Sequence, residues 1–446
     1  MSRNLRLFAA VNRGEQIDLL NMPNYYYADN AVINQLCLTM WNDIRVAFFL
    51  VYKAITRGNK FTLVLTILVT TLAFINIIFS SAFMNGAISK AYQQAKENYV
   101  SNIVILPATD EKYITQVQQL KTKINTLPGV VSSSSRYSQS GVIRYDPDKD
   151  NVDVREKAWT IKSINPDEEI KVTNLQDYMV AGMYLEENDR DQIMMGREIS
   201  GGYEASFEIS SLKGARVGDE VTVTYGNGVK RDYKVKGIYM THFPLADLNV
   251  FVTEKEMESV LQVHNRATEL LVKTDGSVPE SVYVDRLRMM GVENEQINVW
   301  LDFIGYISGL TQTFSIINGI VTFIGLLVAG ITIFIVIFIA TINRRRQIGI
   351  LKAIGMKERI IILSYIFQAV FYAVLGVIVG MVVIEYLIMP YFIRHPFPMP
   401  IGLVSLALVQ RDLAISILSM VTVSIVAGFI PSWMVTRQNI IKAIWG

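Results

Sequence analysis

Four long stretches of the chain contain no charged residue, and they constrain the fold more strongly than any other feature. They run from Phe61 to Ser89, Phe303 to Asn343, Ile360 to Ile384 and Leu413 to Thr436. Each exceeds the roughly 20 residues that a helix needs to cross about 30 Å of hydrocarbon. Since 51% of the 446 residues are hydrophobic, the sequence predicts a membrane α-helical protein with four transmembrane helices.

Charged residues are distributed unevenly between the segment from Lys90 to Asp302 and the rest of the chain. This segment carries 25 Lys and Arg against 33 Asp and Glu, whereas the remainder carries 17 against 7. Basic residues collect on the cytoplasmic side of membrane proteins, so we expect both termini and the loop between the second and third spans to be cytoplasmic. Arg394 and Arg411, in the short loop after the third span, run against this trend.

The uncharged runs and the charges together predict the order of segments in a multi-pass plasma (inner) membrane protein. The predicted segments are a cytoplasmic N-terminal extension (1–40), an interfacial amphipathic helix (41–60), a first span (61–89), an extracytoplasmic, periplasmic domain (90–302), a stalk and second span (303–343), a cytoplasmic helix (344–359), a third span (360–388), an outer loop (389–411), a fourth span (412–436) and a cytoplasmic C-terminus (437–446). The first 40 residues lack the apolar core of a signal peptide, so the first span is expected to remain as an uncleaved anchor. As one helix the second run would be roughly 60 Å long, so part of it is expected to protrude as a stalk.

Between Trp41 and Lys60, apolar residues recur at helical spacing opposite a polar face. This pattern indicates an amphipathic helix that lies on the inner leaflet before the first span. A soluble helix that faces a protein core has the same pattern, and the sequence leaves that alternative open.

The segment from residue 90 to 302 mixes strand and helix patterns, which predicts an α+β domain inserted between the first and second spans. The residues around Asn227 and Gly228 have the turn chemistry of a β-hairpin. The predicted elements are a strand at Asn102–Leu106, a helix at Ile114–Leu127, a hairpin of Glu220–Tyr225 and Lys230–Ile238, a strand and a helix within Asp247–Val263, and a strand at Leu270–Val272.

No motif in the sequence indicates catalysis or nucleotide binding by this chain. There is no GxxxxGK[ST] loop to hold ATP phosphates, no GxSxG elbow and no HExxH helix. His242, His264 and His395 are scattered, and the single cysteine, Cys37, falls on the predicted cytoplasmic side, so no metal site is expected. Glu385 is the only acid near a predicted membrane core; such an acid is a functional candidate, but its place near the end of the span favours an outer-interface residue.

Arg344 to Arg359 (RRRQIGILKAIGMKER) is the segment that points most directly to a function. Its basic cluster marks the inner interface, and Ile348, Leu351 and Ile354 give a short helix an apolar ridge. A partner protein could hold such a ridge in a groove. The same helix could rest on lipid, and the residues alone do not decide between the two.

This segment and the span after it, RRRQIGILKAIGMKERIIILSYIFQAVFYAVLGVIVG, resemble the cytoplasmic loop and third span of permeases of the MacB/FtsX family. The C-terminal PSWMVTRQNIIKAIWG is similar to the usual ending of that family. INPDEEIKVTNLQDYMVAGMYL, IMMGREIS, VGDEVTVTYGNG and YKVKGIY resemble its outer domain, especially in the lipoprotein-releasing (LolC/LolE-like) branch. The resemblance covers roughly Trp41 to Gly446 and leaves the first 40 residues outside.

The resemblance implies a non-catalytic permease subunit of an ABC transporter. Two permease copies, identical or paralogous, would bind a cytoplasmic ATPase dimer, and ATP and Mg would bind to that partner rather than to this chain. ATP-driven movement would pass along the stalk to the outer domain, which would extract lipoproteins or expel a hydrophobic or peptide substrate from the outer face of the membrane. The expected partners therefore include such a substrate and membrane lipid, but no nucleic acid.

Two other functions remain open at this point. One is an FtsX-like signalling permease that activates a cell-wall hydrolase, although the outer domain here is larger than is usual for that type. The other is a membrane-anchored binding protein without an ATPase, which would leave the resemblance of Arg344 to Arg359 unexplained.

The resemblance also assigns candidate site residues. The ATPase-coupling contact is expected to comprise Arg346, Gln347, Ile348, Leu351, Lys352 and Gly355. Gln347 departs from the Glu that is commoner in the family, which argues against a particular salt bridge there. In the third span, Gly376 and Gly380 form a small-xxx-small pair that suits close helix packing and is common in multi-span proteins.

Overall fold

The computed structural model describes residues 43–202, 211–292, 296–303 and 305–437. The predicted N-terminal extension, with Cys37, and nearly all of the predicted C-terminal segment lie outside these residues. The chain divides into two compact units. The described residues 43–76, 324–382 and 414–437 form what we call the helical unit, and the described residues of 77–323 and 383–413 form the α+β unit.

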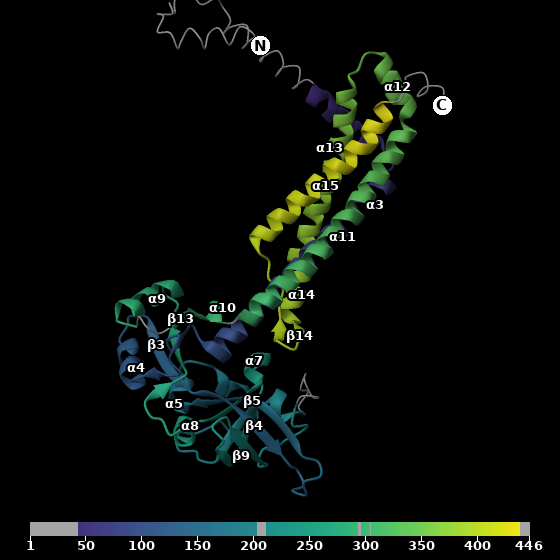
Figure 1. The fold of residues 1–446 in the computed structure, drawn as a ribbon. Coiled ribbons are helices and arrows are strands. Elements are labelled where there is room, and N and C mark those ends of the chain that lie inside the picture. The colour runs from purple at the N-terminus through teal and green to yellow at the C-terminus, as the bar shows by residue number, and fades with distance from the viewer. Residues whose placement is uncertain (1–42, 203–210, 293–295, 304, 438–446) are drawn as a thin grey trace, which may run out of the picture. The chain divides into compact units, whose positions relative to one another are not determined.

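Four long helices contain most of each uncharged run (Figure 1). They are α3 Lys60–Ala95, α11 Gly305–Asn343, α13 Glu358–Val383 and α15 Gln410–Thr436. Each contributes a candidate membrane span by length and composition, and the α+β domain is inserted between the first and the second. The predicted fold class is therefore confirmed.

Small residues bring helices together inside the helical unit. A Cβ atom added to Gly376 of α13 would lie 2.5 Å from Thr70 Oγ1 of α3, and one added to Gly380 would lie 2.7 Å from Phe74 Cδ1. The two glycines of the third span therefore lie in the contact between α13 and α3. The buried apolar residues of this unit's main cluster are Ile333, Ile337, Ile348, Ile361, Tyr365, Ala369, Tyr372, Ala427 and Val435.

Residues 43–57 form a separate short helix before α3. Val51 is buried, whereas Phe48, Phe49 and Tyr52 are each more than half exposed. Aromatic side chains exposed in this way are typical of the membrane–water interface. The prediction that this helix is interfacial stays a prediction.

The larger sheet of the α+β unit closes on itself. Its strands are β4 Ser138–Tyr145, β5 Arg155–Ile164, β6 Met179–Gly182, β7 Gln192–Gly196, β8 Glu220–Tyr225, β9 Lys230–Tyr239 and β10 Asn249–Thr253. They follow the order β6-β9-β7-β10-β5-β4-β8, and β9 also pairs with β8. This closure is possible because Lys230 to Lys234 of β9 pair with β8, whereas Lys234 to Tyr239 pair with β7. The predicted hairpin is β8 and β9, and Ile161, Val223 and Val250 are among the side chains that fill the interior.

A second, smaller sheet carries its own core. Its strands are β1 Ile103–Leu106, β3 Val130–Arg136, β12 Glu269–Thr274 and β13 Gln296–Val299, in the order β13-β1-β12-β3. Helices α4 Val117–Asn125 and α9 Glu280–Met289 contribute to its hydrophobic cluster. The helix predicted from Ile114 begins only at Val117, because Gln116 has a left-handed backbone (φ 53°) and Ile114 instead pairs with Ala267 in the short strand β2 Ile114–Thr115.

Buried charges join the two sheets. Arg136 at the end of β3 donates from Nε to Glu169 Oε2 at 3.2 Å, and from Nη1 to the carbonyl oxygen of Tyr99 at 2.8 Å. Lys162 on β5 donates to Glu269 Oε1 on β12 at 2.7 Å. Burial alone would raise the pKa of Glu169, but the charge of Arg136, with hydrogen bonds from Arg136 and two hydroxyls, lowers that pKa below its usual value.

Within the α+β unit, the helices extend past the uncharged runs. Helix α3 continues to Ala95 and then into the π-helical turn η2 Lys96–Val100. After α13, the chain continues through η5 Ile384–Ile388 and α14 Met389–Arg394 into a hairpin of β14 Phe397–Met399 and β15 Gly402–Val404. The segment after this hairpin packs against α3, since a Cβ atom on Gly86 would lie 1.9 Å from the carbonyl oxygen of Ser405. Glu385 is exposed within η5.

Candidate functional site at helix α12

Helix α12 Arg345–Ala353 connects α11 to α13 and begins directly after the second uncharged run. Its end is set by Gly355, whose φ of 93° lies in the left-handed region that favours glycine. The amide nitrogen of Met356 donates back to the carbonyl oxygen of Leu351 at 3.0 Å, so the end of the helix is capped by the backbone. The sequence ILKAIGM thus forms a short helix with a defined stop.

One face of α12 belongs to the helical unit's core. Ile348 is 4% exposed and packs in the same cluster as Ile361, Tyr365 and Val435, with Leu351 packed against that cluster. Lys352 lies on the same side of the helix and is tied at its charged end. Its Nζ donates to the carbonyl oxygen of Thr436 at 2.6 Å and lies 2.7 Å from Glu358 Oε1. These contacts fix α12 to α13 and α15.

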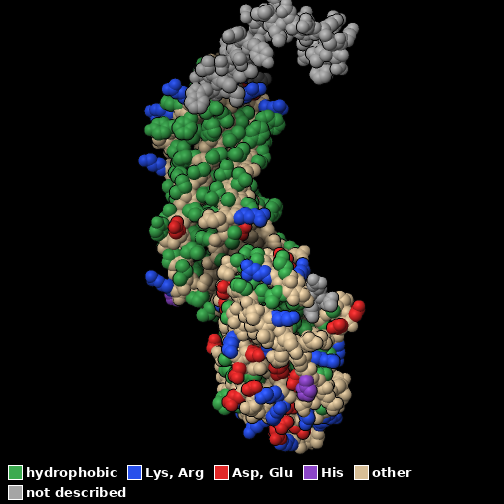
Figure 2. Space-filling model, turned by 90° about the vertical axis from the view of Figure 1, so that its left-hand side faces the viewer, with side chains coloured by type: hydrophobic (Ala, Val, Ile, Leu, Met, Phe, Trp, Pro, Cys, Tyr) green, Lys and Arg blue, Asp and Glu red, His purple; other side chains and the backbone are tan. Residues whose placement is uncertain are grey.

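The other face of α12 is open. Arg345 and Arg346 are exposed, Ile350 is 49% exposed, and Ile354 directly after the helix is 73% exposed. Lys and Arg side chains gather at one end of the helical unit, whereas hydrophobic side chains cover much of its length in this view (Figure 2). An exposed pair of isoleucines beside two arginines is suited to contact with a protein or with lipid headgroups.

The structure divides the predicted coupling residues between these two faces. Arg346, Gln347 and Gly355 are exposed. Ile348, Leu351 and Lys352 instead hold α12 against its own unit, so their side chains do not form the open surface. The ridge expected from Ile348 and Leu351 points inward because residues three and four apart share a helix face, and that face meets α13. The sequence signal that could have identified the open face is the spacing of Arg346, Ile350 and Ile354. They are four residues apart and therefore share one helix face.

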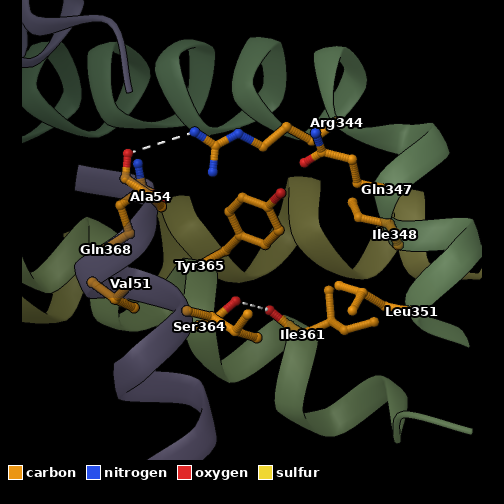
Figure 3. Close-up of a pocket in the computed structure, with 11 residues that line it drawn as sticks. Val51, Ala54, Arg344, Gln347, Ile348, Leu351, Ile361, Ser364, Tyr365 and Gln368 are labelled. Carbon is orange, nitrogen blue, oxygen red and sulfur yellow. Dashed lines mark hydrogen bonds between the residues drawn. The ribbon is translucent and has the colours of Figure 1, made fainter. Parts of the chain in front are cut away.

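A cavity of about 90 Å³ lies beside α12, between the helix of residues 43–57 and α13. Figure 3 shows Arg344 extended across it, with the ring of Tyr365 pointing toward the same space. Arg344 Nη2 approaches the carbonyl oxygen of Ala54 at 3.5 Å. Ser364 and Gln368 also line this cavity and make its wall partly polar. Sequence reasoning used Arg344 only as an interface marker and missed the cavity, because the helix that closes it lies about 290 residues earlier in the chain.

Among the residues that the structure describes, no group of three or more His, Cys, Asp or Glu side chains is close enough to hold a metal ion.

The helical unit matches a known family model. Residues 319–440 match the model described as FtsX-like permease C-terminal. This range covers most of α11 together with α12, α13 and α15, but not the helix of residues 43–57, which lines one side of the cavity.

Curated relatives are similar over part of the chain. The macrolide export ATP-binding/permease protein MacB of Campylobacter jejuni subsp. jejuni serotype O:23/36 (strain 81-176) is 23% identical over 222 residues, which are 48% of this chain and 34% of that protein. The protein of the same name from Azoarcus sp. (strain BH72) is 27% identical over 135 residues, which are 30% of this chain and 18% of that protein. The chain thus spans about a third or less of the length of these relatives.

Solved structures give matches of low overall similarity. The periplasmic region of MacB from Actinobacillus actinomycetemcomitans matches with a TM-score of 0.33 and 12% identity, over 47% of this chain and 93% of that one. The extracellular domain of the noncanonic ABC-type transporter YknZ from Gram-positive bacteria matches with a TM-score of 0.32 and 14% identity. This match covers 44% of this chain and 98% of that one. The comparisons thus relate residues 319–440 to the C-terminal part of FtsX-like permeases, and part of the chain is similar to MacB proteins.

Proposed function

We propose that this chain is the membrane subunit of an ABC transporter, and that a separate cytoplasmic ATPase binds the open face of α12. The observation that carries the proposal is the two-sided construction of this helix. Its inner face is fixed by Ile348 and Lys352, and its outer face presents Arg346, Ile350 and Ile354. A partner that moves α12 would therefore move α13 and α15 with it.

Helix α11 supports a mechanical role for the chain. Its 39 residues correspond to roughly 58 Å of continuous helix, about twice the thickness of the hydrocarbon core. One end is joined directly to α12, and the other follows β13 and α10 Trp300–Phe303 of the α+β unit. Movement at α12 would in this way reach the α+β domain along one covalent element.

The basic residues of the helical unit support the orientation that places α12 in the cytoplasm. In this arrangement ATP and Mg bind to the partner ATPase, and a second permease copy or a paralogue completes the complex. The α+β domain then works at the outer face of the membrane. Its substrate class is a lipoprotein, as the resemblance of the INPDEE segment to the lipoprotein-releasing branch favours, or another hydrophobic or peptide substrate.

The proposal is tested by purifying the full chain from its native membrane in mild detergent and identifying copurifying proteins by mass spectrometry. The matched variant combines Arg346→Glu with Ile350→Ala, which changes only the open face of α12. We expect the amount of bound ATPase to fall about tenfold, because a few central residues carry most of the binding energy of an interface. Lys352 is left unchanged, since its substitution would release α12 from Thr436 and Glu358.

Arg45→Glu is the control, because Arg45 is an exposed basic residue of the helical unit outside α12. It should keep the ATPase at the wild-type level. Copurified acylated lipoproteins would support lipoprotein extraction, and a periplasmic adaptor would indicate efflux. A cell-wall hydrolase would indicate signalling instead. Repeated absence of an ATPase from folded wild-type protein, or equal loss in both variants, would refute the assignment of α12.

A further inference from the structure

Arg344 is a half-buried cation without a described carboxylate partner. The acids among the described residues of the helical unit are Asp43 and Glu358, and each lies beside a lysine: Asp43 beside Lys357 and Glu358 beside Lys352. Among the described residues, the side chain of Arg344 hydrogen-bonds to the carbonyl oxygen of Ala54, at 3.5 Å. A guanidinium has five N–H donors, so most of its hydrogen-bonding capacity remains for a ligand.

Arg344 lines two hollows that offer space for a ligand. The cavity of about 90 Å³ has Gln347, Ser364 and Gln368 in its wall. A second hollow of about 200 Å³ shares Arg344 and Gln368 with the first and adds Asn59 and Thr62. Amide and hydroxyl groups of this kind can hydrogen-bond the oxygens of an anionic headgroup.

Gly58 lies close both to Arg344 and to the carbonyl oxygen that Arg344 approaches. A Cβ atom there would lie 3.8 Å from Arg344 Nη2 and would also meet the carbonyl oxygen of Ala54 at 2.4 Å. Figure 3 shows the guanidinium pointing toward this part of the chain rather than toward α12.

The position of Arg344 along the chain indicates what kind of anion would bind. Arg344 directly follows the uncharged run that ends at Asn343, so it lies at the boundary between hydrocarbon and headgroups. The second hollow also has apolar walls, formed by Leu63, Val336 and Ile339. A ligand with a phosphate next to acyl chains would satisfy the cation and the apolar walls together, whereas a free inorganic anion would satisfy only the cation.

We propose that Arg344 binds the phosphate of an anionic phospholipid, which occupies the two hollows between the helix of residues 43–57, α11 and α13. The lipid joins the interfacial helix to the bundle at a point where the protein itself supplies one long hydrogen bond. The proposal does not depend on the ATPase or on the transported substrate.

The test is native mass spectrometry of the detergent-purified full chain titrated with phosphatidylglycerol, with phosphatidylethanolamine and inorganic phosphate as separate arms. Wild-type protein should retain phosphatidylglycerol in preference to phosphatidylethanolamine. Arg344→Gln should weaken retention of phosphatidylglycerol about tenfold, because a charge-assisted hydrogen bond to phosphate is lost. Arg345→Gln, which removes an exposed charge one residue away, should leave retention unchanged.

Several outcomes would overturn the proposal. Equal retention by Arg344→Gln and wild type would exclude Arg344 as the ligand, and equal retention of the two phospholipids would exclude recognition of the anionic headgroup. Thermal stabilisation of wild type by inorganic phosphate as large as that by phosphatidylglycerol would indicate a free-anion site. If Arg344→Gln does not fold, Arg344→Lys is compared with wild type. The lysine variant should keep the preference for phosphatidylglycerol with lower retention, and undiminished retention would exclude recognition by the guanidinium.

Discussion

Arg136 connects parts of the α+β unit that lie far apart in the sequence. It is 1% exposed, and its partner Glu169 is fully buried. Ser134 and Thr173 donate to the same carboxylate at 2.8 and 2.7 Å, so every oxygen of Glu169 is engaged. Through the carbonyl oxygen of Tyr99, Arg136 also holds the π-helical turn that follows α3.

Arg136→Met should destabilise the α+β unit by about 3–5 kcal/mol, because it leaves the buried charge of Glu169 without its cation. The measurement is urea unfolding of the full chain in detergent, with hydrogen exchange in β3 and β5 as the local signal. Lys149→Met is the control: its pair with Glu220 is exposed to solvent, and its removal should leave the unfolding curve unchanged. An effect of equal size in both variants would contradict the buried-pair argument.

Residue patterns in the sequence predicted part of this residue-level arrangement. The basic cluster and the small-xxx-small pair could be identified because charge and residue size are visible in the sequence. The sequence does not show which face of α12 is open, since Ile348 and Ile350 are equally apolar and only the packing of α13 decides which one is covered. Arg136 and Glu169 lie 33 positions apart on different elements, so their pairing has no local pattern.

At the scale of elements, the contact between α13 and α3 depends on glycine. Gly376→Val should destabilise the helical unit by about 1–3 kcal/mol, because the added atoms would overlap Thr70 and force the helices apart. The measurement is the thermal unfolding midpoint of the full chain in detergent.

Gly319→Val provides the matched control for this prediction. Gly319 lies in α11, and a Cβ atom there meets no described atom within 4 Å. A midpoint that falls equally in both variants would show that loss of glycine itself, rather than the contact with Thr70, causes the change.

The extents of the elements show where hydropathy stops being informative. A span can be recognised because lipid requires an uncharged run of sufficient length. The continuation of α3 through Lys90 and into η2 was not predicted, because outside hydrocarbon a helix can carry charges and gives no hydropathy signal. The short strand at Ile114 was missed for a different reason: it depends on pairing with Ala267, which is distant in the sequence.

At the scale of the whole molecule, the proposed orientation predicts which positions can be labelled from each side of the membrane. Val152 of the α+β unit is 83% exposed and Ile354 of the helical unit is 73% exposed. In a Cys37→Ser background, Val152→Cys should react in intact cells with a membrane-impermeant maleimide once the outer membrane, if present, is made permeable. Ile354→Cys should react only after the inner membrane is opened.

Labelling of both cysteines before the inner membrane is opened would contradict the four-span topology. Labelling of Ile354→Cys alone at that stage would reverse the orientation, and with it the proposed site of the ATPase. Retention of the purified protein as a single folded species by size exclusion is the control for both variants.

The charges at the end of the helical unit have an electrical consequence. Its described residues include Arg45, Lys53, Arg57, Lys60, Arg344, Arg345, Arg346, Lys352, Lys357, Arg359 and Arg437 against Asp43 and Glu358. Moving one elementary charge across an energised membrane corresponds to about 2.3 kcal/mol for each 100 mV. In the proposed orientation the basic end lies on the negative side of the membrane, so the membrane voltage would help to hold the bundle in place. A cell that loses its voltage would then lose part of what keeps this protein oriented.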